Sequence, residues 1–308
     1  MELTFLGTAA GVPSPTRNVS SIGLNLIAEN GSVWLVDAGE GAQLQLMKTA
    51  ITPRRITRIF ITHLHGDHLF GLPGLLSTRS FHQASPLNVY GPVGIASYVE
   101  TSLRLSGTHL TYPCTVHEIP DDQTLFHADG FTVRAVKLDH VVPCFGYRFE
   151  EDARPGELQV DRLRALGLGP GKDYGRLKDG QTVVLPDGRL VVGSDFLGES
   201  RPGRIVAITG DTSPTLRTVE LAREADVLVH ESTYAATEAD MAPRYTHSTC
   251  VDAAHIGAQA GVGRLLLTHV SQRYGDADLD QMQEQAREVF PQSYVMRDLQ
   301  TVDLPLRR

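Results

Sequence analysis

One short stretch of the chain carries an unusual density of side chains that can bind metal ions. Positions 62 to 68 read THLHGDH, so three histidines and one aspartate fall within six residues. This run cannot form one face of a helix, because His63 and His65 would point to opposite sides, and we expect a loop that curls around ions. Neutral imidazole and carboxylate oxygen are suitable zinc ligands. A polar loop with chance histidines is the alternative, and the density of ligands weighs against it.

Three further candidate ligands each follow an apolar run that we expect to form a strand. Ligands gather at strand ends in open α/β sheets, so such strands would bring these side chains to the histidine-rich loop. The count supports two ions, one held by His63, His65 and His140, and the other held by Asp67, His68 and His269. Asp211 suits a bridging position because a carboxylate has two oxygens. Two ions about 3.5–4 Å apart can clamp a hydroxide and polarise a phosphoryl or acyl oxygen.

Asp37 lies at the end of another expected strand and has two possible roles. It can cap the helix expected at 41–49, or it can support a metal-binding histidine by accepting a hydrogen bond from it. The sequence leaves both roles open.

The composition is that of an ordinary globular protein. Of 308 residues, 41 % are hydrophobic and 21 % are charged, which allows one large domain or two small ones. No run approaches the roughly 20 apolar residues that cross a bilayer, and the N-terminus lacks the features of a signal peptide. We therefore expect a cytoplasmic protein with no membrane partner. Its three cysteines form no C-x-x-C pair, so we expect reduced thiols.

One segment departs from the overall charge of the chain. The net charge of −8 argues against nonspecific nucleic-acid binding, which uses clustered lysine and arginine. Residues 154 to about 190 are rich in glycine and proline, with little apolar periodicity, and form either an excursion from the domain or a disordered linker. Between positions 162 and 178 of this segment, five basic residues accompany the single acidic Asp173, and they are Arg162, Arg164, Lys172, Arg176 and Lys178. On composition alone, a solvated loop is the simpler interpretation.

Strands and helices alternate on both sides of this segment, which fits layers with helices outside and mixed sheets inside. Asn30-Gly31 is a strong hairpin signal between two of the strands. The two halves look broadly alike, which hints at a duplicated sandwich. The expected strands are 3–6, 22–27, 32–36, 59–61, 87–90, 115–118, 124–127, 131–138, 144–149, 204–209, 227–230, 264–268 and 294–296, and the expected helices are 41–49, 72–79, 93–105, 215–225, 248–260 and 279–289.

With these ligands in view, the sequence resembles the metallo-β-lactamase superfamily, and further motifs resemble the short form of the ribonuclease Z family. The motifs are PSPTRN at 13–18, FGLPGL at 70–75, HEST at 230–233 and HST at 247–249. The resemblance spans the chain and implies an α+β four-layer αββα sandwich, with residues 1–308 forming one domain. It also implies that residues 151–193 are an inserted flexible arm, the exosite that grips tRNA. Pro15 and Lys172 depart from the family pattern, which has a lysine and a proline there.

The activity that the resemblance implies is that of a zinc phosphodiesterase. It would remove the 3′ trailer from precursor tRNA, leaving a 3′-OH on the tRNA and a 5′-phosphate on the trailer. It would use two Zn²⁺ per subunit, with Mn²⁺ as the alternative because His/Asp sites accept several metals. The resemblance further implies a homodimer, in which the arm of one subunit reaches the tRNA held by the other.

Particular residues can be assigned roles in this activity. Asp67 is expected to act as the general base. His247 is expected to protonate the leaving 3′ oxygen, since imidazole titrates near working pH, and Glu231 to orient it; alternatively, His247 is only a neighbour of a helix start. His230, at a buried strand end, has the weaker case for a direct role. The expected RNA contacts are Arg17, Ser248 and Thr249, together with five basic residues of the arm, Arg162, Arg164, Lys172, Arg176 and Lys178.

Two other functions remain open. The first is another hydrolase of the superfamily, such as a lactonase or a small phosphodiesterase, and the basic arm argues against it because a small substrate has no need of one. The second is a catalytically inactive scaffold that binds RNA, and the complete set of expected ligands argues against it.

Overall fold

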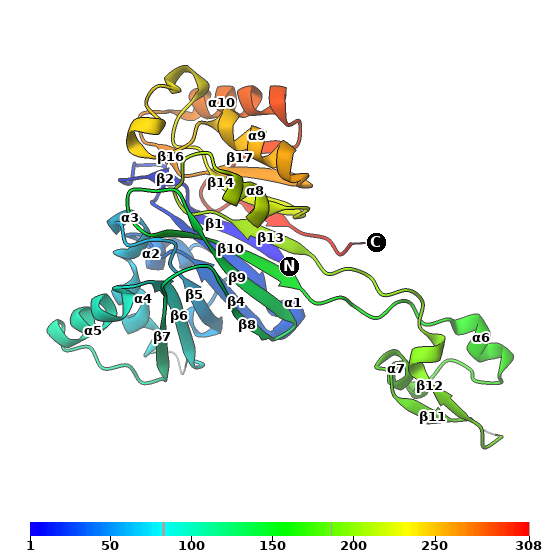
Figure 1. The fold of residues 1–308 in the computed structure, drawn as a ribbon. Coiled ribbons are helices and arrows are strands. Elements are labelled where there is room, and N and C mark those ends of the chain that lie inside the picture. Colours follow the sequence, from blue (N-terminus) through cyan, green and yellow to red (C-terminus); the bar gives the residue numbers. More distant parts are fainter. Residues whose placement is uncertain (82–83, 186, 308) are drawn as a thin grey trace. The chain divides into compact units, whose positions relative to one another are not determined.

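The computed structural model describes residues 1–81, 84–185 and 187–307, and the chain divides into two compact units. The larger unit, Met1–Glu150 with Ile205–Pro305, contains two seven-stranded sheets (Figure 1). The smaller unit comprises Glu151–Arg204 and the last residues of the chain. Among the described residues, no helix is both long enough and apolar enough to cross a bilayer.

The first sheet has the strand order β18-β1-β3-β4-β5-β6-β7. β1, β3 and β4 pair antiparallel, whereas β4 to β7 are parallel. The carboxyl ends of β4 and β5 therefore lie at the same edge. The strands are β1 Glu2–Gly7, β3 Ser21–Leu26, β4 Ser32–Val36, β5 Ile56–Phe60, β6 Leu87–Pro92, β7 Cys114–Ile119 and β18 Thr301–Asp303.

The second sheet has the order β17-β15-β14-β13-β10-β9-β8, and β13, β14, β15 and β17 are parallel. A short parallel pair, β2 Ala9–Ala10 with β16 Val270–Ser271, joins the first loop of the chain to the segment after β15. The strands are β8 Gln123–Ala128, β9 Phe131–Leu138, β10 Cys144–Glu151, β13 Ile205–Ile208, β14 Val227–Glu231, β15 Arg264–Thr268 and β17 Ser293–Val295.

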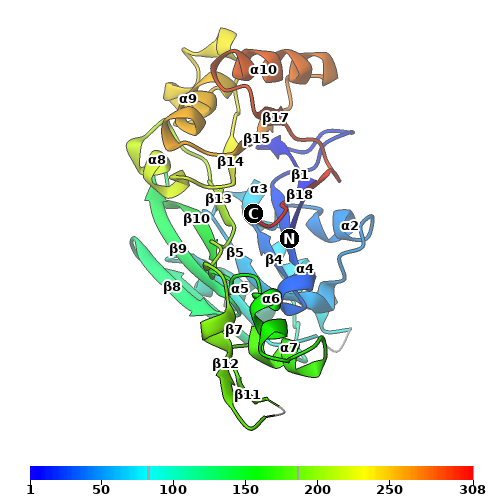
Figure 2. The ribbon, with the colours of Figure 1, turned by 90° about the vertical axis from the view of Figure 1, so that its right-hand side faces the viewer.

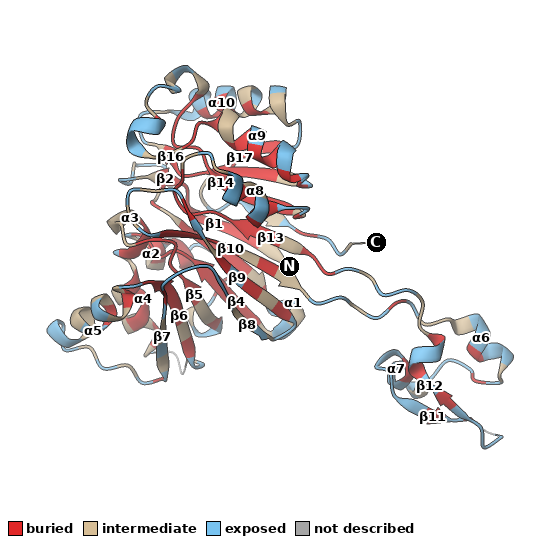
Figure 3. Cartoon of the chain, viewed as in Figure 1, coloured by how far each residue is buried: buried red, intermediate tan, exposed pale blue. Residues whose placement is uncertain are grey.

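Three apolar clusters hold these layers together. The largest lies between the sheets and joins Trp34 and Phe60 of the first to Phe149 and Val229 of the second. The other two pack helices on the outer faces, α2, α4 and α5 on the first sheet and α8, α9 and α10 on the second (Figures 1 and 2). Figure 3 shows the resulting burial of the strands. The helices are α2 Ala42–Leu46, α4 Leu72–Arg79, α5 Ile95–Leu105, α8 Leu216–Ala222, α9 Cys250–Ala260 and α10 Asp276–Val289. The predicted αββα sandwich is confirmed.

Local differences from the predicted elements have local causes. The Asn30-Gly31 hairpin forms, but one helical turn, α1 Ile27–Asn30, connects its strands, and Gly31 ends that turn at a φ of 79°. A left-handed residue of this kind is the usual end of a helix. The polar Thr301–Asp303 gave no strand signal, because its pairing with β1 defines it.

The smaller unit is folded, so its interpretation as a solvated loop or disordered linker is wrong. Two short helices, α6 Val160–Ala165 and α7 Lys172–Lys178, accompany the hairpin of β11 Thr182–Val184 and β12 Leu190–Val192. Their elements are too short to give apolar periodicity. The unit has its own small core, which includes Leu163, Leu168, Leu177, Val183, Leu185, Val191 and Phe196.

Candidate metal centre

The candidate ligands converge where strand ends of the two sheets meet in the larger unit. His63 follows β5, His140 follows β9, Asp211 follows β13 and His269 directly follows β15. Parallel pairing within each sheet brings strand ends to one edge, which is where ligands collect in such sheets. The histidine-rich loop ends in the short helix α3, Gly66–Leu69, which carries Asp67 and His68.

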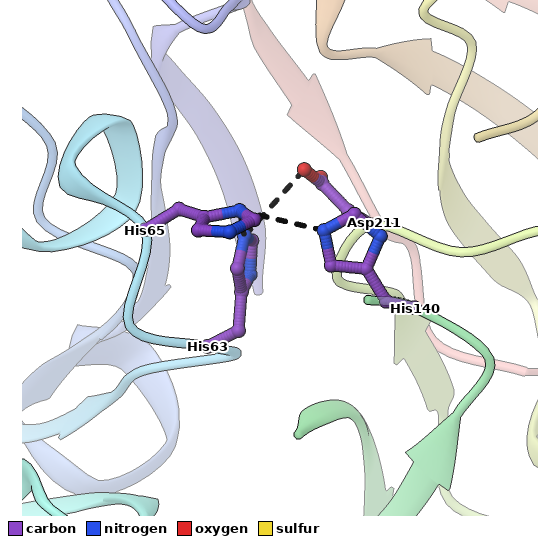
Figure 4. A group of neighbouring side chains, drawn as sticks. All are labelled: His63, His65, His140 and Asp211. Carbon is purple, nitrogen blue, oxygen red and sulfur yellow. Dashed lines mark hydrogen bonds and ion pairs between the residues drawn. The ribbon is translucent and has the colours of Figure 1, made fainter. Parts of the chain in front are cut away.

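A first group contains His63, His65, His140 and Asp211, whose ligand atoms all lie within 4.8 Å of one another (Figure 4). Nδ1 of His65 lies 3.1 Å from Nε2 of His63 and 3.4 Å from Nε2 of His140. Oδ2 of Asp211 lies 3.5 Å from Nε2 of His63. Three imidazole nitrogens and a carboxylate oxygen thus face a common point.

A second group contains Asp67, His68 and His269. Nε2 of His269 lies 3.2 Å from Nε2 of His68 and 3.3 Å from Oδ2 of Asp67. Asp211 reaches this group too, since its Oδ2 lies 3.4 Å from Nε2 of His269 and its Oδ1 lies 3.5 Å from Nε2 of His68. The structure therefore brings all seven side chains together, with Asp211 between the two groups.

Four of the histidine rings have their outward nitrogens held by hydrogen bonds. When Nδ1 carries the proton, Nε2 keeps its electron pair for a cation, and such bonds fix both the tautomer and the ring orientation. The Nδ1 partners are the Thr62 hydroxyl for His63 at 3.0 Å, Asp37 for His68 at 2.7 Å, the Thr246 carbonyl for His140 at 3.1 Å, and the Thr233 hydroxyl for His269 at 2.9 Å. The three threonines were not identified from the sequence, although Thr233 lies within the HEST motif.

Asp37 supports the centre and does not cap a helix. Its Oδ2 accepts from Nδ1 of His68 at 2.7 Å and from the Thr62 hydroxyl at 3.0 Å, while its Oδ1 accepts from the Thr62 amide at 2.8 Å. The residue before α2 is Gly41, and no side chain caps that helix. The capping alternative is therefore wrong, and Asp37 is the hydrogen-bond acceptor that the other alternative describes.

Replacement of Asp37 by asparagine is expected to weaken zinc binding about 10- to 100-fold, the usual cost of losing such a partner. Asparagine has the same shape and tolerates the φ of 60° found here. Its amide would meet Nδ1 of His68 with a hydrogen, so the proton of that ring would move to Nε2, the atom meant for the cation. Competition with a chromogenic chelator measures the affinity. Asp129→Asn, at a φ of 56° outside the centre, is the matched control, and equal affinities for the two variants would contradict the role of Asp37.

The charges of the cluster suit cations. Burial and the surrounding histidines hold the pKa of His63 well below its ordinary value, so this imidazole stays neutral. Burial alone would raise the pKa of Asp211, but His269, His68 and His63 outweigh it and hold the carboxyl ionised. Burial likewise opposes ionisation of Asp67, yet hydrogen bonds with His269 and His68 keep its pKa far below normal. Imidazole nitrogens and carboxylate oxygens, without a thiolate, form a donor set that fits zinc or manganese.

His247 and Glu231 form a separate pair beside these two groups. Nδ1 of His247 lies 2.9 Å from Oε1 of Glu231, and 4.0 Å from Oδ2 of Asp211. Burial alone would lower the pKa of His247, but the hydrogen bond and charge of Glu231 raise it to about 9. Glu231 is itself buried and accepts from the amides of Thr212, Ser248 and Thr233 and from the Thr233 hydroxyl. The pair thus presents a protonated imidazole in a fixed orientation.

Three of the expected RNA contacts are engaged within the protein. The guanidinium of Arg17 is buried and donates to the carbonyls of Val270, Ser271 and Tyr274. Ser248 is buried, and its hydroxyl donates to the Thr212 carbonyl at 2.7 Å. Thr249 caps α9 in a reciprocal capping box with Asp252. RNA contact by Arg17, Ser248 or Thr249 remains a prediction, and it would require these bonds to break. His230 is also buried, and its Nδ1 is held by the Glu231 carbonyl at 2.7 Å, away from the two groups.

The five basic residues of the smaller unit that were predicted to contact RNA, at positions 162, 164, 172, 176 and 178, are all exposed. Arg164 pairs with Asp161 at 3.4 Å and Arg176 pairs with Asp173 at 3.2 Å. Arg162 stacks over Phe196, with its guanidinium carbon 4.7 Å from the ring centroid. Within the described residues, no ion pair engages Lys172 or Lys178, so these two ammonium groups are the ones most available to an external anion.

Known proteins resemble this chain in sequence and in fold. The family model described as anti-Pycsar protein Apyc1 matches residues 1–153. A "Ribonuclease Z" of Limosilactobacillus reuteri is 53 % identical over 309 residues, covering 100 % of both chains. The structure of human tRNase Z, short form, is similar with a TM-score of 0.73 and 33 % identity, covering 99 % of this chain and 100 % of that one. A metallo-β-lactamase fold protein from Bacillus subtilis, YhfI, shares the fold with a TM-score of 0.68, covering 98 % of this chain and 99 % of its own, at 18 % identity.

Proposed function

Since this chain belongs to the ribonuclease Z family, we propose that it is a metal-dependent endoribonuclease that removes the 3′ trailer from precursor tRNA. The observation that carries the proposal is the convergence of seven histidine and aspartate side chains in two groups that share Asp211, beside the His247–Glu231 pair. This arrangement suits hydrolysis of a phosphodiester. Water adds to phosphorus, the bond to the 3′ oxygen of the tRNA breaks, and the trailer keeps the phosphate.

We propose two Zn²⁺ per subunit, with Mn²⁺ as the alternative. His63, His65 and His140 would hold one ion, Asp67, His68 and His269 the other, and Asp211 would bridge them. When bound, such ions supply Lewis acidity, which polarises the phosphoryl oxygens and lowers the pKa of water to near 7. All other steps depend on the protein's own side chains.

Asp67 is the residue that we propose as acceptor of the proton of the attacking water. Its Oδ2 faces His68, His269 and the Gly11 amide, which donates to it at 2.7 Å. Its Oδ1 has no hydrogen bond within the described part of the chain, so this oxygen can accept one from water. A carboxylate with one oxygen anchored and the other free can orient a nucleophile and act as its base.

The departing 3′ oxygen must gain a proton, and His247 can donate one. Its Nδ1 is held by Glu231, so the proton on Nε2 is the one directed away from this carboxylate. The raised pKa of about 9 keeps the ring protonated at neutral pH. Glu231, with its four other hydrogen bonds, positions the ring and stabilises its charge.

Replacement of His247 by asparagine is expected to lower kcat for precursor tRNA about 10²- to 10⁴-fold, the usual contribution of a general acid. The asparagine amide can still donate to Glu231 but has no proton to give to the substrate. A p-nitrophenyl phosphodiester should lose much less activity, because its leaving group departs as a stable anion. Initial rates on both substrates measure the difference.

The control for this variant is His117→Asn, which changes a histidine bonded to Asn88 outside the centre. It should leave both rates unchanged. Equal losses on the two substrates in His247→Asn would assign His247 a structural role. Loss of a general acid slows the 3′ oxygen, which must be protonated as it leaves, more than it slows p-nitrophenolate, which leaves as an anion.

The whole proposal is tested by incubating the purified protein with a trailer-bearing precursor tRNA. The expected products are a tRNA ending in a 3′-OH and a trailer beginning with a 5′-phosphate. A chelator should stop the reaction, and added Zn²⁺ or Mn²⁺ should restore it. Products with the phosphate on the tRNA side, or full activity in excess chelator, would exclude this mechanism.

We further propose that the smaller unit is the arm that binds the body of the tRNA, in keeping with its exposed lysines and arginines. Arg17, Ser248 and Thr249 are kept as weaker candidates for RNA contact, because each is engaged within the protein. Maturation of precursor tRNA also favours the cytoplasmic location that the sequence predicts.

We propose a homodimer, with exposed apolar side chains of the larger unit as candidates for its interface. Leu44 on α2, Met47 directly after α2 and Phe70 directly after α3 are 63, 76 and 63 % exposed. Gln43 bonds α2 to Thr78 of α4. Exposed apolar groups of this size commonly mark protein interfaces. Sedimentation should give the mass of a dimer, and Met47→Glu should shift it toward the monomer; a monomeric wild type would exclude the assembly.

A further inference from the structure

A row of aromatic rings leads from the metal centre to the surface of the larger unit. The ring of His269 stacks on that of His247 at 5.5 Å between centroids. Tyr234 packs against the edge of His247 at 6.2 Å, and Tyr245 lies 6.5 Å beyond Tyr234. The row begins at a candidate ligand, passes the proton donor, and ends in solvent.

The last ring of the row is exposed. Tyr245 is 54 % exposed, whereas Tyr234 is 6 % exposed and fills the space between it and His247. Aromatic side chains bury a large area when they can, so an exposed tyrosine beside a reaction centre presents a face to something outside the protein. The ring face of a tyrosine suits the face of a nucleobase, and such stacks are common where proteins bind single-stranded nucleic acid.

The backbone next to Tyr245 is fixed by the metal centre itself. Thr246 has a φ of 55°, and its carbonyl and hydroxyl lie 3.1 and 3.0 Å from Nδ1 of His140. His247, one residue further, is held by Glu231. The position of Tyr245 is therefore fixed relative to a candidate ligand and to the proton donor. A side chain that binds substrate needs such a fixed position relative to the reacting groups.

The loop that carries Tyr245 is anchored at several points. Glu238 pairs with Arg273 at 2.8 Å, and the guanidinium of Arg273 lies 5.5 Å from the centroid of Tyr234. The amide of Ala235 donates to the Tyr274 hydroxyl at 3.0 Å. A loop held in this way pays little entropy when a ligand binds.

We propose that Tyr245 is a stacking platform for the base of the last tRNA nucleotide, the one whose 3′ oxygen leaves. The assignment to this nucleotide rests on the proposed function. His247 must touch that 3′ oxygen to protonate it, and Tyr245 lies two rings beyond His247 in the row, on the side of Tyr234, where the nucleotide that carries the oxygen can reach it. Every base has a π face, and the platform therefore tolerates any base at this position, with larger purines bound more strongly than pyrimidines.

The proposal is tested with precursor tRNAs that carry either a purine or an abasic site at the last tRNA position. Tyr245→Ala should lower kcat/KM on the purine substrate between about fivefold and about a hundredfold, which corresponds to one base–aromatic stack. Tyr245→Phe should stay within about twofold of wild type, because the ring is kept. On the abasic substrate, Tyr245→Ala and wild type should be equally active. Phe81→Ala, which removes another exposed aromatic ring, is the matched control.

A second measurement needs no turnover. Product tRNA with 2-aminopurine as its terminal base is bound to the metal-loaded protein, and its fluorescence should be quenched by wild type and Tyr245→Phe but not by Tyr245→Ala. A wild type that quenches the probe without cleaving precursor tRNA would keep the platform and exclude the proposed function. A wild type that cleaves, with quenching or kcat/KM unaffected by Tyr245→Ala, would exclude the platform. An equal loss on purine and abasic substrates would also exclude it, because Tyr245 would then act through the metal centre.

Discussion

Replacement of Asp67 by alanine is expected to lower kcat for precursor tRNA by about a thousandfold or more, while the fold and the affinity for RNA are kept. A general base alone contributes about 10²–10⁴ in rate, and Asp67 also faces Nε2 of His68 and of His269 at 3.5 and 3.3 Å. The side chain belongs to none of the apolar clusters, so its loss leaves the core intact. Circular dichroism, RNA binding and initial rates measure the three quantities.

Asp67→Asn separates the loss of the base from the loss of a ligand. Asparagine keeps an oxygen that can accept from the Gly11 amide, so the first loop stays in place. It cannot take the proton of water, and kcat should fall even where bound zinc per subunit remains that of wild type. If Asp67→Ala keeps its turnover within tenfold of wild type, Asp67 is not the base. If zinc and turnover fall together in both variants, Asp67 acts mainly as a ligand.

The sandwich could be predicted because its determinants are local and apolar. From Phe131 to Val136, buried residues alternate with half-buried or exposed ones, and Arg264–Thr268 is a short apolar run with polar flanks. Both strands have their predicted bounds, 131–138 and 264–268. The helix Leu72–Arg79 was also predicted with its observed bounds. By contrast, Thr301–Asp303 is a strand only because β1 lies beside it, and the small core of the smaller unit joins apolar residues too scattered to give a period.

The centre could be predicted as a set of residues but not as a set of contacts. Spacing and strand ends identified every member of the two groups, because ligand types are rare at such positions. The sequence could not decide whether Asp37 caps a helix or supports a histidine, since that depends on where His68 lies after folding. Arg17 shows the same limit, because its motif suggests RNA whereas its guanidinium reaches the carbonyl of Val270, more than 250 positions away in sequence. Thr246 gave no signal, since its carbonyl and hydroxyl meet His140, more than 100 positions away in sequence, only after folding.

Removal of the smaller unit is expected to abolish cleavage of precursor tRNA and to spare a p-nitrophenyl phosphodiester. Its ends are suited to excision, because Arg154 and Arg201 form an antiparallel bridge with hydrogen bonds of 2.8 and 2.9 Å. An Asn-Gly turn in place of residues 155–200 should therefore close the hairpin. The excised segment takes its small core with it, and the three clusters of the larger unit contain no residue from it.

The physical reason for this selective loss is that most of the affinity for tRNA comes from phosphate contacts far from the scissile bond. Lys172 and Lys178, which lack ion pairs within the described residues, should account for part of it. Lys172→Ala combined with Lys178→Ala should raise KM for precursor tRNA. The slope of log KM against log salt concentration should fall by up to about two, which is about one for each lysine removed. Arg164→Ala, which removes a cation already paired with Asp161, is the matched control and should have a smaller effect.

The two substrates decide what the smaller unit does, because they share the chemistry and differ only in size and charge. Loss of tRNA cleavage with the chromogenic rate retained would establish the unit as a binding arm. Retention of both rates after excision would show that the larger unit binds the tRNA unaided, and the exosite would be abandoned. Loss of both rates, with zinc content lowered, would show that the unit stabilises the metal centre instead, and the lysine variants would then leave the salt dependence unchanged.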